Sequence, residues 1–225
     1  MSPSPSTSAP NADLAPSAVM EITFGATKTP LVLASASAIR ATVLRNAGVP
    51  FEIVPAHVDE AGLKHTLRAE RADAEACALA LAALKAQHVS AQRPGALVIG
   101  ADQMLDCDGV WFDKPADRAQ AEASLRALRG KTHVLVAGVV VARDGVRLWQ
   151  HVERSRLTMR RLDDAFIAAY LDAAGAPVLQ SVGAYQLEGL GVHLFSHVDG
   201  DFFAILGLPL LPLLDLLRQH GIVAS

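Results

Sequence analysis

The chain has 225 residues, of which 51% are hydrophobic, so it can bury a full core, and no run of about 18 uncharged apolar residues predicts a membrane span. Its 20 Lys and Arg against 23 Asp and Glu give a formal net charge of -3, which excludes a broad cationic face for nucleic acid but allows a few cations around a small anion. Two cysteines are too few for a disulfide framework or a zinc knuckle and predict reduced thiols in a cytoplasmic protein.

The first 28 residues are rich in Ser, Pro and Ala and lack the basic and apolar regions of a secretion signal. Such a composition cannot bury enough apolar surface to order itself. We therefore expect a disordered tail at residues 1–28 and a single domain at residues 29–225.

The N-terminal part of this domain alternates short apolar runs with helical patterns, which predicts an α/β architecture. Ser35 or Ser37 can cap a first helix, and Gly48 ends it. One long amphipathic helix is expected from about Leu67 to Val89. The strands expected in this part are 31–34, 51–54 and 96–105.

The C-terminal part predicts two long neighbouring strands. Residues 134–142 are almost wholly apolar, as expected for a strand covered on both faces, and Asp144-Gly145 predicts a hairpin turn into an alternating strand at 146–159. Because hairpin strands run antiparallel, we predict a mixed, twisted central sheet flanked by helices. The other elements expected are helices at 119–128, from Asp163 or Asp164 to Leu171, and from Pro209 to Gln219, and a short strand around Phe195.

Small hydroxyls, cations and carboxylates gather at the ends of the predicted strands. Ser35 and Ser37 precede a helix whose free N–H groups and positive dipole end can bind an anion, and Arg40 lies in the same turn. Asp102 ends a buried strand, and Lys114 follows a short hairpin. Each residue alone also fits an ordinary role, as a helix cap, a turn residue or a solvated charge.

Taken together, these residues and the glycine-rich stretch 183–191 resemble the Maf family of nucleoside triphosphate pyrophosphatases, in order and approximate spacing, from about Leu31 to Gly221. The family's first motif, Leu-Ala-Ser-x-Ser-Pro-Arg-Arg, departs here because Ala38 replaces the proline and Ile39 replaces the first arginine. The resemblance implies the ITPase-like architecture of this family.

Further family motifs match along the chain. The Asp-Glu pair is Asp59-Glu60, the helix lysine is Lys85, the Gly-Ala-Asp motif ends at Asp102, and Gly-x-x-His ends at His133. Without the resemblance, a lysine on a long helix would be expected to face water, and His133, at the head of a strand, to be structural.

The resemblance implies hydrolysis of a nucleoside triphosphate to a monophosphate and pyrophosphate, with Mg²⁺ or Mn²⁺ as the divalent cofactor. Asp102 would be the general base or would activate a metal-bound water, with Glu60 as the second carboxylate, and both would be metal ligands. Lys85 and Lys114 complete the expected catalytic set. The residues expected to hold the phosphate chain are Ser35, Ser37, Arg40, Lys85 and Lys114.

Three positions that vary with substrate in the family are occupied by Ile39, Gln103 and Glu188. A buried carboxylate at Glu188 could accept hydrogen bonds from the N1–H and amine of guanine, which thymine and uracil cannot offer. We therefore expect guanine-type nucleotides such as 7-methyl-GTP, although Ile39 cannot stack on a base as tryptophan would. Gln186 is a rival contact, and a solvated Glu188 is the alternative.

Two other function classes stay open at this stage. One is a nucleotide-binding regulator of cell division without significant turnover, and the other is a sugar-phosphate or nucleotide transferase. The expected partner is a small nucleotide, with neither nucleic acid nor membrane. A homodimer is left open.

Overall fold

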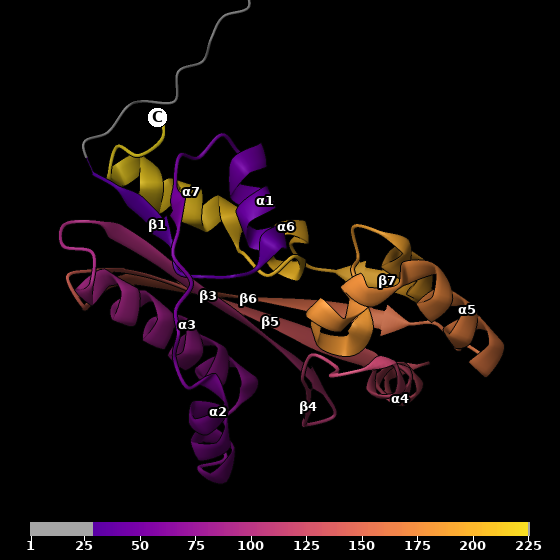
Figure 1. Ribbon diagram of the computed structural model, residues 1–225. Helices are drawn as coiled ribbons and strands as arrows, with labels where there is room; N and C mark the ends of the chain where they lie inside the picture. Colours follow the sequence, from indigo (N-terminus) through magenta and orange to yellow (C-terminus); the bar gives the residue numbers. More distant parts are fainter. Residues whose placement is uncertain (1–28, 225) are drawn as a thin grey trace, which may run out of the picture.

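The computed structural model describes residues 29–224, so the tail expected at residues 1–28 lies outside them. These residues form a seven-stranded sheet with the order β2-β1-β3-β5-β6-β7, and β4 pairs with β3 (Figure 1). β1 runs parallel to β2 and β3, and all other pairs are antiparallel. The predicted mixed sheet is confirmed. Its strands are β1 Leu31–Leu33, β2 Glu52–Ile53, β3 Leu97–Cys107, β4 Val110–Phe112, β5 Thr132–Arg143, β6 Val146–Met159 and β7 Phe195–Asp199.

Helices cover the sheet in three groups (Figure 1). α1 and α7 pack on one face of β1, β3 and β5, whereas α3 lies on the other face. α4, α5 and three short 3₁₀ helices enclose a second apolar cluster around the distal ends of the long strands. The helices are α1 Ala38–Asn46, α2 Glu60–Ala69, α3 Ala74–Ala91, α4 Arg118–Leu128, α5 Asp164–Ala174, η1 Ala176–Gln180, η2 Val182–Ala184, η3 Leu190–Leu194, α6 Phe202–Ile205 and α7 Leu210–Gln219.

α3 lies unusually close to the sheet because two strand glycines face it. A Cβ added at Gly100 would meet the backbone nitrogen of Ala86 at 2.6 Å, and one at Gly138 would meet the carbonyl carbon of Ala78 at 2.9 Å. Backbone atoms cannot move aside as a flexible side chain can. The two glycines therefore fix how near α3, and every side chain it carries, comes to β3 and β5.

The single long helix expected from Leu67 to Val89 is wrong. Two helices occupy this region, and each begins at an aspartate cap: Asp59 accepts a hydrogen bond from the Gly62 N–H, and Asp73 from the Ala76 N–H. Arg71, between the helices, has a φ of 58°, which ends the first one. The apolar spacing continues across the break, which contains neither Gly nor Pro, so the helical periodicity concealed it.

Most other elements lie within a few residues of their expected positions. Asp108-Gly109 and Asp144-Gly145 both form turns with positive φ at both residues, as tight hairpins require. The side chain of neither Ser35 nor Ser37 caps α1, although Ser37 occupies the capping position. Among the helices of residues 29–224, none is both long enough and apolar enough to cross a membrane.

Candidate active site

One open pocket of about 550 Å³ brings together distant parts of the chain. Its walls are the loop from β1 into α1, the start of α2, the middle of β3 and the stretch 180–188. The expectation that Asp102 ends its strand is wrong, because β3 continues to Cys107 and pairs with β5 on both sides of Asp102. All ten residues predicted for the site line it: Ser35, Ser37, Ile39, Arg40, Glu60, Lys85, Asp102, Gln103, Lys114 and Glu188. Its size suits a small organic ligand.

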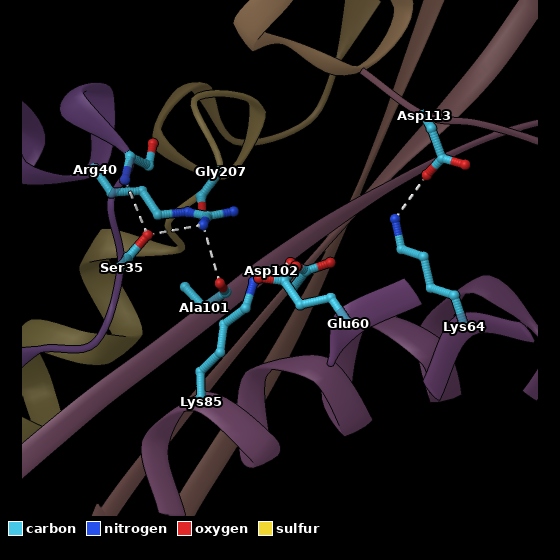
Figure 2. A network of polar contacts seen from close by, with 10 residues as sticks. Ser35, Arg40, Glu60, Lys64, Lys85, Ala101, Asp102, Asp113 and Gly207 are labelled. Carbon is cyan, nitrogen blue, oxygen red and sulfur yellow. Dashed lines mark hydrogen bonds and ion pairs between the residues drawn. The ribbon is translucent and has the colours of Figure 1, made fainter. Parts of the chain in front are cut away.

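A buried lysine joins two of the carboxylates that line the pocket, those of Asp102 and Glu60 (Figure 2). The Lys85 Nζ atom lies 2.7 Å from Oδ1 of Asp102 and 2.9 Å from Oε2 of Glu60. The side chains of Lys85 and Asp102 are only 8% and 10% exposed, whereas that of Glu60 is 44% exposed. The expectation that a lysine on a long helix faces water is therefore wrong for Lys85, because α3 packs closely against the sheet beside Asp102.

Arg40 connects three segments in the wall of the pocket. Its Nε donates to the Gly207 carbonyl at 2.8 Å, and its Nη1 donates to the Ala101 carbonyl at 2.9 Å and to the Ser35 hydroxyl at 3.2 Å (Figure 2). Among the described residues, Nη2 has no hydrogen-bond partner. Burial lowers the pKa of Arg40, while the charge of Asp102 opposes that shift. Arg40 thus supports the loop and keeps donors for an anion.

The Ser35 hydroxyl organises the start of α1. It also accepts a hydrogen bond from the Ser37 N–H at 3.2 Å, so it holds the loop rather than capping the helix. Ser35 is buried and Ser37 half-buried. With the N–H groups of the first turn of α1 nearby, this loop is suited to an anionic group.

Sequence reasoning missed a second ion pair on the pocket wall, between Lys64 of α2 and Asp113, whose Nζ and Oδ1 atoms lie 2.7 Å apart (Figure 2). Burial alone would lower the pKa of Lys64, but its hydrogen bond and charge attraction to Asp113 raise it overall. Asp59 is a typical helix N-cap, and Glu60 and Lys64, four residues apart, would lie on the same face of the helix that follows it. This spacing could have indicated that both residues reach the pocket.

Lys114 also lines the pocket, and its side chain is exposed. Desolvation at the pocket wall and the nearby charge of Arg40 lower its pKa. The ammonium group of Lys114 is therefore available to a ligand in the pocket. That of Lys85 is already paired with Asp102 and Glu60.

Gln103 and Glu188 both line the pocket. The Gln103 Nε2 group donates to the carbonyls of Ala204 and Ile205, at 3.0 and 2.9 Å, so both its N–H donors are used. The expectation of a buried carboxylate at Glu188 is wrong, because this residue is exposed at the pocket rim after the buried Tyr185. Ile39 is half-buried and supplies an apolar side chain at the start of α1.

Tyr185 links the 180–188 wall to the sheet. Its hydroxyl lies 2.6 Å from Nε2 of His133, and both side chains are buried. Burial lowers the pKa of His133 to about 4, so the imidazole is neutral near pH 7. The expectation that His133 is structural agrees with this placement. Tyr185 also packs edge-on against Phe195, with ring centroids 4.8 Å apart.

The fold and this pocket define an α/β protein with a charged cleft of a size that suits a small molecule. The model of the family described as Maf-like protein matches residues 30–220, and the chain belongs to this family. Three similar proteins are each named nucleoside triphosphate pyrophosphatase. They come from Paramagnetospirillum magneticum (58% identical, covering 84% of this chain and 98% of that protein), Rhodospirillum rubrum (50%, covering 87% and 97%) and Nitrobacter winogradskyi (53%, covering 87% and 96%).

Proposed function

We propose that this protein hydrolyses nucleoside triphosphates to nucleoside monophosphate and pyrophosphate. The observation that carries the proposal is Lys85, buried between Asp102 and Glu60 in a pocket whose opposite wall is the Ser35–Arg40 loop. Family membership and the names of the similar proteins support the same activity.

The charges of the pocket favour a divalent cation as cofactor. Four cationic and four carboxylate side chains line it, so their formal charges cancel and leave no net charge to balance a triphosphate. Glu60 and Asp102 offer the one or two carboxylates with which Mg²⁺ or Mn²⁺ is usually held when phosphates supply further ligands. A bound cation would neutralise charge on the phosphate oxygens and make the α phosphorus more electrophilic.

The residues of the chain divide the remaining work. The Ser35 loop, Arg40 and Lys114 bind and orient the phosphates, and Lys85 holds the Asp102 carboxylate in place. Asp102 takes the proton of the attacking water, whose oxygen bonds to the α phosphorus. The bond from that phosphorus to the α–β bridging oxygen breaks, and the electron pair leaves with pyrophosphate.

We further propose a preference for guanine-type nucleotides, including 7-methyl-GTP. Because both N–H donors of Gln103 are used, its amide can offer a ligand only the acceptor Oε1, and the Glu188 carboxylate is an acceptor too. The Watson–Crick edge of guanine offers two N–H donors, N1–H and the amine, whereas that of uracil or thymine offers one. Ile39 gives an apolar contact but no aromatic stacking.

A substrate panel tests both levels of the proposal. The values of kcat/KM for GTP, 7-methyl-GTP, dTTP and UTP would be measured by pyrophosphate release with Mg²⁺ or Mn²⁺, and after chelation. We expect kcat/KM to be higher for GTP and 7-methyl-GTP than for dTTP and UTP. Glu188→Gln should reduce this ratio by roughly 10-fold, which corresponds to the free energy of one charged hydrogen bond. Glu70→Gln, an exposed change outside the pocket, is the control. Equal or better use of dTTP and UTP by the wild type rules the preference out, and no release from any nucleotide rules out the activity.

A further inference from the structure

The ion pair of Lys64 and Asp113 lies across Asp102 from Arg40. Figure 2 shows the pair on one side of Asp102 and Arg40 on the other. Glu60 and Lys64 lie four residues apart on α2, so about 6 Å of helix axis separates them. All five side chains line the same pocket. Two cations, Arg40 and Lys64, therefore flank the carboxylate centre from opposite sides.

The proposed nucleobase contacts lie on the side of Arg40. Ile39 precedes Arg40 in α1, and Gln103 donates to two carbonyls of α6, the helix directly before the carbonyl that accepts from Arg40. In the proposed reaction, the α phosphorus lies at Asp102, where the attacking water loses its proton. With the base on the Arg40 side, the β and γ phosphates extend past Asp102 towards Lys64.

The ammonium group of Lys64 is suited to a terminal phosphate. Its Nζ atom lies 2.7 Å from Oδ1 of Asp113, and this contact raises the pKa of Lys64 despite its partial burial, so the group stays charged. An ammonium has three N–H donors, and the hydrogen bond to Asp113 uses one of them. Asp113 is 55% exposed, so its carboxylate can turn to water when a phosphate takes its place.

A second cation accompanies Lys64 on this side. Lys114 directly follows Asp113 in the chain and also lines the pocket. As the bond to the α phosphorus breaks, negative charge develops on the departing pyrophosphate, and cations already in place stabilise it. Lys114 and Lys64 together therefore offer one cation to each phosphate of the leaving group.

α2 has contacts to the rest of the fold that do not involve Lys64. Leu63 and Leu67 pack against the apolar cluster of α3 and the sheet, and the guanidinium of Arg68 lies 5.1 Å from the centre of the Trp111 ring. These contacts keep α2 in place when the ion pair is removed. Changes at Lys64 or Asp113 therefore test the charge of the pair and not the docking of the helix.

We propose that Lys64 binds the γ phosphate of the substrate and that Asp113 holds its ammonium group in position until that phosphate arrives. The proposal rests on the proposed function, which places the α phosphorus at Asp102. A triphosphate reaches Lys64, whereas a diphosphate ends before it. The pair thus determines how many phosphates the pocket recognises.

The number of phosphates on a bound nucleotide tests this contact. Dissociation constants of the α,β-methylene triphosphates and diphosphates of guanosine and uridine would be measured by calorimetry with Mg²⁺. Carbon replaces the bridging oxygen of these analogues, so they bind without cleavage at that position. For each base, the diphosphate constant divided by the triphosphate constant measures how much affinity the γ phosphate adds.

The two partners of the pair should affect this ratio differently. Lys64→Met should reduce it about tenfold, which corresponds to the loss of one charged hydrogen bond. Asp113→Asn should keep it at least at the wild-type value, because it removes a competing negative charge and leaves Lys64 charged. Lys131→Met is the matched control, since it removes a lysine from an exposed pair with Asp108 outside the pocket, and the ratio should not change.

An unchanged ratio in Lys64→Met would overturn the proposal. So would a ratio that falls in both variants, because a pair that only braces the pocket wall is lost whichever partner is removed. Pyrophosphate release from the natural nucleotides reports separately on the proposed function. Its absence together with the expected ratios would reject the hydrolysis and keep the contact, whereas intact release with an unchanged ratio would reject the contact alone. Failure of the wild type to bind the triphosphate analogues would overturn both.

Discussion

The Nζ atom of Lys85 lies 2.7 Å from Oδ1 of Asp102, and both side chains are almost fully buried although their residues belong to different layers of the fold. Lys85 comes from α3 and Asp102 from β3, with Gly100 two residues before the aspartate. The pairing of a helix lysine with a strand carboxylate thus depends on the distance between the helix and the sheet. It also means that changing either residue alone leaves a buried charge with fewer partners.

Asp102→Asn keeps the shape of the side chain but removes the proton acceptor and its charge. We expect turnover to fall roughly 10²–10⁴-fold with a modest change in the fold, because Lys85 keeps Glu60 as a partner. Pyrophosphate release and nucleotide affinity should be measured together. Near-normal release would remove Asp102 from the proposed role, while binding without release in the wild type would favour the regulator alternative.

Lys85→Met removes the buried ammonium and leaves the Asp102 carboxylate without its cation. Breaking a buried pair in this way costs about 3–5 kcal/mol of unfolding free energy. Lys64→Met is the matched control, because its partner Asp113 is 55% exposed and such a pair contributes about 1 kcal/mol or less. Urea unfolding of both variants makes the comparison. Equal losses would show that the burial of Lys85 has no energetic consequence.

His133 should make the protein less stable in mild acid. Its pKa is about 4 in the folded chain and 6.5 when unfolded, so the unfolded chain binds more protons between these values. This part of the stability is complete above pH 6.5 and is lost as the pH falls towards 4, by up to about 3 kcal/mol. Urea unfolding from pH 7 to 4 measures it. His133→Gln should reduce the dependence of the unfolding free energy on pH. An unchanged dependence would show that other groups cause it.

Tyr185→Phe should act on the pocket through the 180–188 wall. It keeps the ring that packs on Phe195 and removes only the hydroxyl that meets His133. We expect KM to rise several-fold with kcat little changed, because a loosened wall weakens binding without touching the reacting groups. Tyr170→Phe removes a longer hydrogen bond, of 3.3 Å, to the Ala184 carbonyl of the same wall, and should raise KM in the same direction but less. A fall in kcat alone would contradict this positioning role.

Gly100→Ala should displace α3 from the sheet. Its Cβ would meet the backbone of Ala86, so overpacking should cost about 1–3 kcal/mol and move Lys85 away from Asp102. Stability and turnover should fall together. Gly189→Ala is the control for stability, since its nearest neighbour would be 3.9 Å away at a negative φ. A stable, fully active Gly100→Ala variant would show that α3 can move away from the sheet without loss of stability or turnover.

The sequence by itself determined the strands and hairpins, because apolar runs and Asp-Gly turns act over a few residues. It also indicated which polar residues converge, through the family motifs they match, although Asp102 lies in the middle of β3 and not at its end. It did not reveal the break between α2 and α3, where a φ of 58° at Arg71 and the cap of Asp73 end one helix and begin the next without glycine or proline.

Only the tertiary structure decided which charges are buried and what each one faces. Lys85 is buried because Gly100 and Gly138 bring α3 close to the sheet, and Gln103 becomes an acceptor because α6 takes both its donors. Glu188 stays exposed because its segment reaches the surface after Tyr185. Such outcomes depend on contacts between residues far apart in the chain, and local spacing carries no information about how closely those segments pack.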